Sequence, residues 1–374
     1  MRFLAFLALC CLSVLAQAQT LPQAPTIAAK SWLLLDYSTG QALASYNPDD
    51  RVEPASLTKL MTAYVVLGAL KEGRLKPDQA LPVSERAWKT PGSRMFIEPK
   101  KPVTVDELLR GMIVQSGNDA CIALAEAVAG SEEAFAQMMN REAQRLGLKA
   151  TRFANATGLP DPQHYSTARD LGALAAALIR DHPEHYPLYA LREYTYNRIT
   201  QANRNRLLWL DPAVDGVKTG HTENAGYCLV ASAKRGPRRL LSVVMGAASD
   251  GMRTQESQKL LNFGFQFFDS VKLYGKDQEV SRLRVWKGAQ NTVRAGFLED
   301  FTLSLPKGMA ENLKASLVSQ QPLLAPVLKG QRLATLKLSL DERPYGEYPV
   351  VALETVPVAG MIGRAWDAMR LWFE

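Results

Sequence analysis

Hydrophobic and polar residues follow two patterns along the chain: short apolar runs typical of strands, and apolar positions that recur at helical spacing. These patterns predict the first elements of the structure. Apolar runs at residues 32–36 and 42–46 flank a Tyr-Ser-Thr-Gly turn, which predicts a β-hairpin. Between Pro54 and Gly73 the apolar positions recur at helical spacing and predict a helix over residues 55–71. The helical period also predicts helices over residues 105–114, 119–128, 132–146 and 168–180.

Strand patterns return after residue 218. Residues 226–233 and 240–247 are β-rich and are separated by a Lys-Arg-Gly-Pro turn. Strands at both ends with helices between them indicate one α+β domain, whose sheet is completed by strands distant in sequence. A helical pattern over residues 258–271 is expected to end this domain.

The pattern changes again at about residue 280. Short alternating runs cut by Pro and Gly continue to about residue 355 and predict a small all-β sandwich. We therefore place a first domain at residues 19–274 and a β-rich domain at residues 275–357. A length of 374 residues fits two such units.

The N-terminal segment has a pattern of its own. Arg2, an apolar run over residues 3–15 and Ala-Gln-Ala at residues 16–18 predict a signal peptide over residues 1–18, cleaved before Gln19. A transmembrane anchor is the alternative, but it needs roughly twenty apolar residues, more than this run offers. The segment therefore predicts export.

The C-terminal segment, residues 358–374, is predicted to form an amphipathic helix. One side of this helix carries Met361, Ile362, Ala365, Trp366, Met369, Trp372 and Phe373, and the other carries Arg364, Asp367, Arg370 and Glu374. A tryptophan-bearing apolar face at the end of an exported chain favours attachment to a membrane surface. Docking on the β-rich domain is the alternative.

Composition narrows the classes of partner. The formal charge is +7, one unit less without Arg2, which suits an anionic wall or membrane surface. Basic residues are scattered without interleaved aromatics, so we expect no nucleic-acid partner.

The His-Pro-Glu-His run at residues 182–185 lacks metal-ligand spacing, so we expect no metal and no cofactor. Cys121 and Cys228 remain after cleavage, too few for a disulfide framework, and Cys121 is expected to be a buried thiol.

Three short motifs carry the chemistry, in the order Ser56-Leu57-Thr58-Lys59, Ser116-Gly117-Asn118 and Lys218-Thr219-Gly220. An S-x-x-K is expected by chance about once in a chain this long. A second match begins at Ser304, in a segment that predicts a strand running into a turn, and a second S-x-N begins at Ser45, before the first motif. The prediction therefore rests on the order and context of the three motifs.

The first motif supplies a nucleophile and a base. Serine is a poor nucleophile at neutral pH and needs an adjacent base. A spacing of three on a helix puts Ser56 and Lys59 on one face, within reach of a hydrogen bond. Lys59 accepts a proton only when it is neutral, so burial or a nearby cation must lower its pKa, and Lys218 is a candidate for that cation. The positive end of the helix beneath Ser56 favours charge that develops on an attacked carbonyl.

This set of motifs resembles that of penicillin-binding proteins and β-lactamases. The similarity is closest to the low-molecular-mass D-alanyl-D-alanine carboxypeptidases of the bacterial cell envelope, and segments 54–62, 115–120, 164–170 and 215–222 extend it over nearly the whole mature chain. The resemblance implies a penicillin-binding/β-lactamase-like catalytic domain, with an antiparallel sheet, helices and a helical lobe. It also implies the β-rich module that follows.

The resemblance further implies roles for the first two motifs. Ser116 is expected to relay a proton toward the leaving amine, and Asn118 to hydrogen-bond the substrate amide or Lys59. The backbone N–H groups of Ser56 and His221 are expected to form the oxyanion hole.

The third motif is expected on an edge strand beside the substrate. Lys218 would hold Ser116 and the substrate's terminal carboxylate electrostatically, and Thr219 would add a hydroxyl to that carboxylate. Gly220 would leave room for the substrate backbone. Arg253 occupies the place of the family's carboxylate-binding arginine, with a plain surface arginine as the alternative.

Together these residues predict a serine DD-carboxypeptidase. Its acyl-enzyme on Ser56 would release D-alanine from the peptidoglycan stem pentapeptide, and β-lactams would acylate the same serine. The expected location is the periplasmic side of the inner membrane.

A β-lactamase is one alternative, but no E-x-x-L-N segment lies between Asn118 and Lys218. The others are a DD-endopeptidase, which usually lacks such C-terminal extensions, and a non-catalytic wall-binding scaffold, against which the intact motifs argue.

Overall fold

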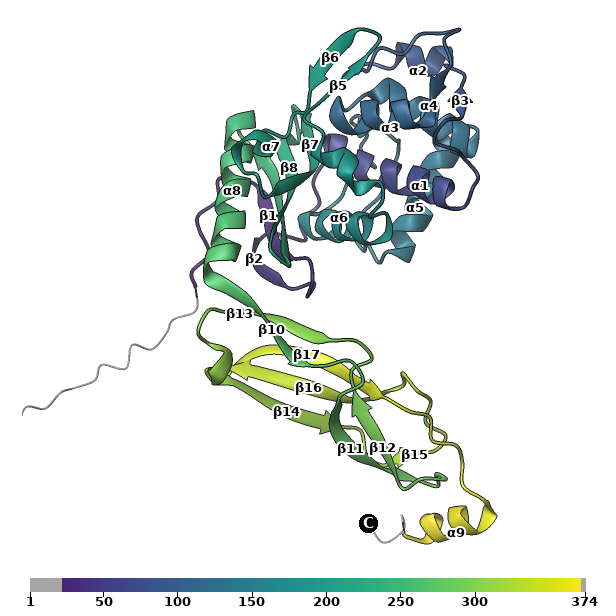
Figure 1. Cartoon of the computed structure of the whole chain (residues 1–374), viewed down its shortest axis with the longest axis vertical. Helices are drawn as coiled ribbons and strands as arrows, with labels where there is room; N and C mark the ends of the chain where they lie inside the picture. Colours follow the sequence, from purple (N-terminus) through teal and green to yellow (C-terminus); the bar gives the residue numbers. More distant parts are fainter. Residues whose placement is uncertain (1–21, 371–374) are drawn as a thin grey trace, which may run out of the picture.

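The larger folded unit is built on a five-stranded antiparallel sheet (Figure 1). The computed structural model describes residues 22–370, so the predicted signal peptide, residues 1–18, and its cleavage site before Gln19 lie outside the described residues. In spatial order the strands are β2 (Ala42–Tyr46), β1 (Ser31–Asp36), β9 (Arg238–Ala247), β8 (Gly226–Arg235) and β7 (Val214–Thr222). The sheet therefore joins the first strands of the chain to strands two hundred residues later, as the pattern predicted.

Helices cover both faces of this sheet. The long helix α8 (Asp250–Phe267) packs on one face against β8 and β9, and α6 (Ala168–Asp181) packs on the other against β1 and β9. Beside α6 lies a helical lobe of α1 (Lys59–Lys71), α3 (Val105–Val114), α4 (Asn118–Ala129) and α5 (Glu132–Arg145). The unit is completed by the short elements β3 (Ala80–Leu81), α2 (Glu85–Lys89), β4 (Val103–Thr104), η2 (Tyr186–Ala190), β5 (Glu193–Tyr196), β6 (Ile199–Ala202) and α7 (Leu207–Leu210).

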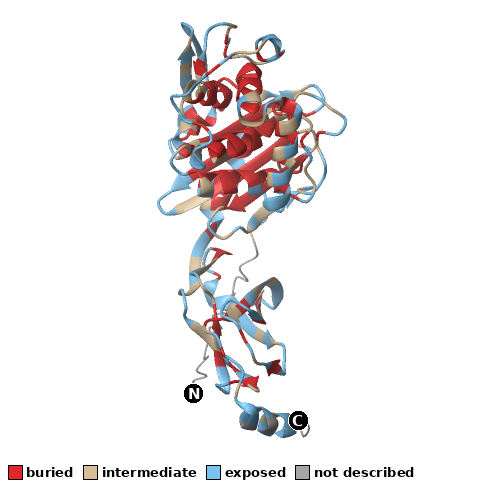
Figure 2. Cartoon of the chain, turned by 90° about the vertical axis from the view of Figure 1, so that its right-hand side faces the viewer, coloured by how far each residue is buried: buried red, intermediate tan, exposed pale blue. Residues whose placement is uncertain are grey.

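Strand β1 shows how the core is divided. Leu33 and Leu35 belong to the core on the helical-lobe side, whereas Trp32 and Leu34 belong to the core beneath α8. Successive side chains of a strand point to opposite faces, so a strand buried on both faces reads as one continuous apolar run. Figure 2 shows this buried centre of the larger unit. Cys121 and Cys228 are both buried free thiols within it.

One predicted helix has different bounds in the structure. The pattern predicted a helix over residues 258–271, but α8 begins at Asp250 and ends at Phe267, and residues 268–274 form strand β10 (Phe268–Tyr274). The Ser249 side chain accepts a hydrogen bond from the Met252 N–H and so caps an earlier start. Strand β10 pairs with β13 (Phe301–Pro306), a partner about thirty residues away that a local pattern does not reveal.

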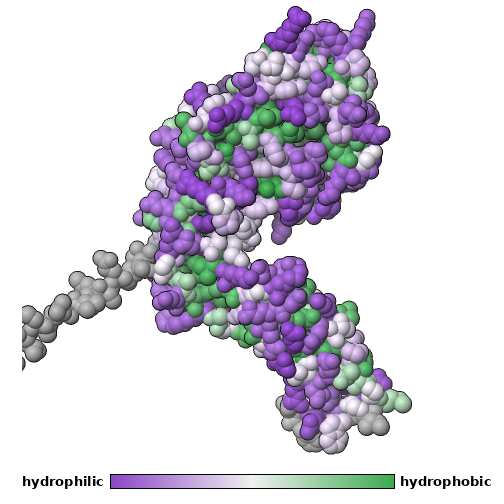
Figure 3. Space-filling model, viewed as in Figure 1, coloured by the Kyte–Doolittle hydropathy of each residue, from purple (hydrophilic) through white to green (hydrophobic). Residues whose placement is uncertain are grey.

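The second unit is all-β, and the predicted fold class is confirmed. A six-stranded sheet and the β10–β13 pair share one hydrophobic core, which contains Leu303 and Leu305 of β13. In spatial order the six strands are β14 (Leu313–Ser319), β16 (Arg332–Leu340), β17 (Arg343–Ala352), β12 (Thr292–Gly296), β11 (Glu279–Trp286) and β15 (Leu323–Leu324), with η3 (Ala310–Asn312) before β14. In the space-filling view the two units form separate lobes joined by a narrower waist (Figure 3).

A buried polar cluster connects the two units at this waist. Asp36 at the end of β1 accepts hydrogen bonds from Arg238 Nε (3.0 Å) and from Ser304 Oγ of β13 (2.7 Å). Arg238 also donates to the carbonyl oxygen of Gly264 in α8 (3.0 Å). Ser304, the serine of the second S-x-x-K match, therefore lies in a strand as predicted, and its hydroxyl is engaged in this contact between the units.

The last described element is helix α9 (Met361–Arg370), which follows the β-rich unit (Figure 1). Trp372, Phe373 and Glu374, part of the predicted amphipathic helix, lie outside the described residues. Across residues 22–370, the structure contains no helix of sufficient length and apolar character to span a membrane.

Candidate active site

Ser56 and Lys59 lie side by side at the start of the first helix. A 3₁₀ turn, η1 (Ala55–Thr58), leads directly into α1, so Ser56 sits in this turn and Lys59 is the first residue of the α-helix. The sequence had predicted one continuous helix from residue 55. Lys59 Nζ lies 2.9 Å from Ser56 Oγ, so the structure brings the predicted nucleophile and base into hydrogen-bond contact.

Two carbonyl oxygens fix the orientation of the Lys59 amine. Lys59 Nζ donates to Asn118 Oδ1 (2.8 Å) and to the backbone oxygen of Thr157 (2.6 Å), and its side chain is buried. Carbonyl oxygens only accept hydrogen bonds, whereas a hydroxyl can donate or accept. A neutral amine has two hydrogens and one lone pair. With both hydrogens given to the carbonyls, the lone pair is left for the Ser56 hydroxyl.

Burial also favours the neutral form of this amine. The pKa of Lys59 is lowered to about 8, mainly by desolvation and to a smaller extent by the positive charge of Arg204. The pKa of Lys218 is held well below its ordinary value, first by burial and then by the positive charges of Lys59, Arg204 and Arg253. Arg204 is thus a neighbouring cation that the sequence reasoning, which considered only Lys218, did not find.

Ser116 and Asn118 occupy the link between α3 and α4. Ser116 has a positive φ of 61°, and its hydroxyl accepts a hydrogen bond from Lys218 Nζ at 2.9 Å. Asn118 is the first residue of α4, and its Nδ2 donates to the Pro91 carbonyl (2.7 Å), which leaves its Oδ1 facing Lys59. The three motifs are therefore linked by two sets of hydrogen bonds, one among Ser56, Lys59 and Asn118 and the other between Ser116 and Lys218.

The third motif lies on β7, an edge strand of the sheet, as predicted. The structure adds a packing role for Gly220 to the expected one. A Cβ at this position would lie 3.0 Å from the Pro54 carbonyl oxygen and 3.3 Å from Ala55 Cβ. The missing side chain lets η1 approach β7 closely, so Gly220 holds the nucleophile turn against the edge strand.

Arg253 is a buried residue of α8 and not a surface arginine. Its Nη1 donates to the Gly220 carbonyl (3.0 Å), and its Nη2 pairs with Asp250 (2.5 Å). The guanidinium also lies 5.5 Å from the ring centroid of Tyr227, which in turn packs against His221. The predicted carboxylate-binding arginine is therefore held in place at the edge strand.

These residues line one cleft of about 570 Å³, which contains Ser56, Ser116, Thr219, Gly220, His221 and Arg253. The sequence analysis missed Ser93 and Arg204, which also line it and are joined by a hydrogen bond of 2.7 Å from Arg204 Nη1 to Ser93 Oγ. Neither residue stands beside a motif, so no local pattern pointed to them. The cleft is rich in positive charge and suits a ligand that carries a carboxylate.

His164 connects the Thr157 loop to the first motif, and the sequence analysis gave it no role. Its Nε2 lies 2.8 Å from Thr58 Oγ1, and its Nδ1 accepts the Ala154 N–H at 3.3 Å. Since Nδ1 accepts, we assign the hydrogen of the neutral ring to Nε2, which donates to Thr58. Burial lowers the pKa of His164 to about 4. Gly158 completes the contact, because a Cβ there would lie 1.8 Å from the Ala55 carbonyl oxygen.

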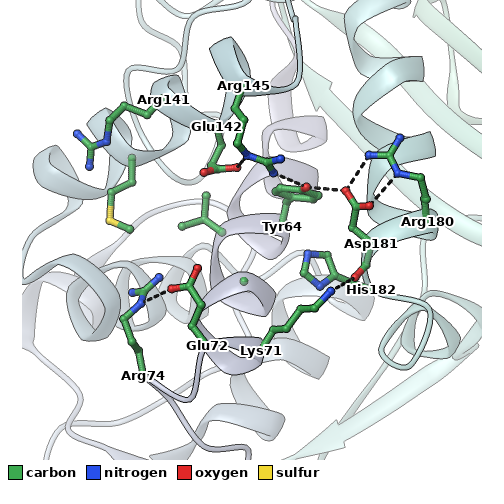
Figure 4. A pocket seen from close by; sticks show the side chains of 13 residues that line it. Tyr64, Lys71, Glu72, Arg74, Arg141, Glu142, Arg145, Arg180, Asp181 and His182 are labelled. Carbon is green, nitrogen blue, oxygen red and sulfur yellow. Dashed lines mark hydrogen bonds and ion pairs between the residues drawn. The ribbon is translucent and has the colours of Figure 1, made fainter. Parts of the chain in front are cut away.

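A separate hollow of about 500 Å³ lies at the other end of α1 (Figure 4). Lys59 begins this helix and Lys71 ends it, about 18 Å apart at 1.5 Å per residue. The hollow contains none of the predicted site residues. Buried His182 lies in its wall, whereas Pro183 and Glu184 of the same run are exposed in a turn. Among residues 22–370, no group of three or more His, Cys, Asp or Glu side chains could hold a metal ion.

The burial of His164 predicts that the protein loses stability at acid pH. The folded-state pKa of about 4 lies below the ordinary value of 6.5, so the unfolded chain binds the extra proton first as the pH falls. His164 should therefore lower the free energy of unfolding by about 3 kcal/mol as the pH falls from 7 to 4. His164→Gln, which keeps a donor but does not titrate, should remove that part of the loss. Urea unfolding at both pH values measures it, and an identical pH dependence in both proteins would contradict the assignment.

Comparisons with known proteins agree with this geometry. Residues 18–249 match the family model of the S11 peptidases, described as D-alanyl-D-alanine carboxypeptidase, and residues 268–358 match the C-terminal domain of penicillin-binding protein 5. The chain is 45% identical over 377 residues to D-alanyl-D-alanine carboxypeptidase DacC of Escherichia coli K12, covering 99% of this chain and 94% of the relative.

Solved structures show the same likeness. Penicillin-binding protein 5 from Haemophilus influenzae superposes with a TM-score of 0.84 at 42% identity, covering 90% of this chain and 99% of that one. Penicillin-binding protein D2 from Listeria monocytogenes, in its ampicillin-bound form, gives a TM-score of 0.61 at 31% identity over 65% of this chain and all of that one. The chain therefore belongs to the S11 family of D-alanyl-D-alanine carboxypeptidases, as its motifs implied.

Proposed function

We propose that this protein is a serine D-alanyl-D-alanine carboxypeptidase that trims peptidoglycan stem pentapeptides through an acyl-enzyme on Ser56. The observation that carries the proposal is the Lys59 amine, held by two carbonyl oxygens with its remaining contact at Ser56 Oγ. Family membership over nearly the whole chain supports the same activity.

Acylation begins with transfer of the Ser56 proton to the neutral Lys59. Ser56 Oγ then attacks the carbonyl carbon between the two terminal D-alanines and forms a tetrahedral intermediate. The backbone N–H groups of Ser56 and His221 stabilise its oxyanion. Lys218, Thr219 and Arg253 receive the terminal carboxylate at the positively charged end of the cleft.

The leaving amine needs a proton before D-alanine departs. Ser116 supplies it through its hydroxyl, which is replenished from Lys218 across their 2.9 Å contact. The proton that Lys59 took from Ser56 passes through solvent to the neutral Lys218, so both amines return to their starting states. Water then attacks the acyl carbon with Lys59 as the base, and Lys59 returns that proton to Ser56 Oγ as the tetrapeptide leaves. A β-lactam acylates Ser56 by the same first step, but its leaving group stays tethered to the acyl group.

Replacing the nucleophile tests the activity. Ser56→Ala should lower the release of D-alanine from a pentapeptide by about 10⁴-fold or more, because no other nucleophile among residues 22–370 hydrogen-bonds to Lys59. Ser45→Ala, in the second S-x-N match on β2, is the matched control and should keep full activity. Peptide mapping should place a labelled penicillin on Ser56 and leave Ser304 unmodified. Equal activity of Ser56→Ala and the parent protein would refute the proposal, and rapid penicillin turnover would favour a β-lactamase.

The pKa of Lys59 predicts the pH profile of acylation. Only the neutral amine accepts the Ser56 proton, so the rate of penicillin attachment should rise about tenfold per pH unit below pH 8 and level off above it. The rate constant of adduct formation between pH 6 and pH 9 measures this, with the folded fraction followed at each pH. A flat profile over that range would show that Lys59 is not the base.

We further propose that the mature protein is exported and attaches peripherally to the periplasmic face of the inner membrane through α9. The Asp367 carboxylate accepts a hydrogen bond from the Lys287 N–H (2.6 Å), so the polar side of the helix contacts the β-rich unit. The apolar side is exposed, with Met361 80%, Trp366 55% and Met369 51% accessible. This orientation supports burial in a lipid interface and argues against docking of the apolar face on the β-rich unit.

Flotation with phospholipid vesicles tests this attachment. Trp366→Asp should lower the vesicle-bound fraction of the mature protein severalfold, and removal of residues 361–374 should abolish binding, because both changes remove apolar area from the interface. Val318→Asp is the matched control, since Val318 is similarly exposed (51%) but lies on β14. If the protein lacking residues 361–374 floats as well as the parent, another surface holds the membrane.

A further inference from the structure

An exposed apolar ridge lies on the β-rich unit, in the segment between β14 and β16. Residues 321–329 read Gln-Pro-Leu-Leu-Ala-Pro-Val-Leu-Lys. Leu323 and Val327 of this segment are buried in the core of the unit. The alternate positions are exposed and are all apolar, and we call them the ridge: Pro322, Leu324, Pro326 and Leu328. Leu324 is 49% and Leu328 61% accessible.

The ridge differs from an ordinary surface strand. A strand with one buried face normally carries polar residues on its other face. Strand β16 follows this rule, since Leu336 and Leu338 are buried in the core while Thr335, Lys337 and Ser339 lie at the less buried positions between and beside them. The ridge keeps the same alternation but places apolar side chains on the outside. A row of exposed apolar side chains of this kind marks a contact surface.

The first link between the ridge and α9 runs through β11. Leu324 pairs with Trp286, and the next residue, Lys287, donates its N–H to Asp367 of α9 (2.6 Å). Paired strands lie about 4.8 Å apart, and one residue of a strand spans about 3.3 Å. An interfacial helix enters lipid to a depth of about 5–10 Å. A bilayer that takes up α9 is therefore within reach of Leu324.

The second link is the chain that leads into α9. Val327 pairs with Val356 across an isolated bridge, and the two residues that follow, Pro357 and Val358, are exposed. The helix begins at Met361, three residues later. Figure 1 shows β15 and α9 at the same end of the β-rich unit. The ridge, this connecting segment and α9 therefore form a continuous set of exposed apolar residues.

Basic side chains border this set of residues. Lys329 is exposed directly after the ridge, and Arg364 and Arg370 are exposed on α9. Cations beside an apolar surface suit the phosphates of lipid headgroups. Charge and continuity with α9 therefore both favour a lipid bilayer as the partner of the ridge.

We propose that the ridge is a second membrane contact, which enters the headgroup region of a phospholipid bilayer together with α9. The inference rests on the proposed attachment through α9 and adds the surface of the β-rich unit that meets the lipid. With both contacts made, this end of the unit, rather than one of its sides, faces the bilayer.

Site-specific labels on the full mature chain test the contact directly. Leu328→Cys and the matched control Val318→Cys, at positions 61% and 51% accessible, each receive a polarity-sensitive fluorophore. The parent chain, treated in the same way, corrects for any labelling of the buried Cys121 and Cys228. On mixed phosphatidylethanolamine and phosphatidylglycerol vesicles, the label at residue 328 should shift to shorter wavelength. The label at residue 318, on β14, should keep its aqueous emission.

A double variant measures the strength of the contact. Leu324→Asp combined with Leu328→Asp should lower the vesicle partition coefficient about tenfold or more, because both leucines lose their apolar area in the interface. Val318→Asp should leave the partition coefficient unchanged. All variants should bind penicillin at the parent rate, since none of these positions lines the catalytic cleft.

The outcomes separate the ridge from the attachment through α9. If the parent protein floats but the label at residue 328 keeps its aqueous emission, or the double variant partitions like the parent, the ridge does not contact lipid and α9 acts alone. A shift that requires high protein concentration and no vesicles would show an interface between copies of this chain and overturn the lipid contact. Absence of vesicle binding by the parent protein would overturn the proposed attachment and the ridge with it.

Discussion

The burial of one amine, that of Lys59, sets the requirements for the rest of the catalytic unit. A buried ammonium is costly, so the amine is favoured as a neutral base. Two carbonyl oxygens, from Asn118 and Thr157, take its hydrogens and direct its lone pair toward Ser56.

Asn118, Thr157 and Ser56 come from segments far apart in the chain, so the fold must bring these segments together around Lys59. Asn118 is fixed by the Pro91 carbonyl, the Thr157 loop by His164 and Glu132, and the nucleophile turn by its close approach to Gly220. Two glycines that lie against the Ser56 turn are constrained as well. A Cβ at Gly158 would meet the Ala55 carbonyl oxygen, and a Cβ at Gly220 would press on the Pro54 carbonyl oxygen and on Ala55 Cβ.

The β-rich unit is joined to this catalytic unit by a buried ion pair and hydroxyl rather than by a flexible linker. Asp36, Arg238 and Ser304 link the first sheet to β13, and β10 continues directly from α8. Since α9 follows the β-rich unit, this connection also relates the position of α9 to the unit that holds the cleft.

The Ser56–Lys59 contact, the strand of the third motif and most helices could be predicted from the sequence, because each depends on residues that are close together in the chain. The order of the three motifs was enough to indicate the family. Helix α3 has the predicted bounds, and Ser56 and Lys59 meet across one turn. Contacts between distant segments bring Thr157, His164 and Arg204 to the site, make residues 268–274 a strand and place Pro54 against Gly220. These contacts join segments about thirty to one hundred and sixty residues apart, and pairing over such separations leaves no period in the local sequence.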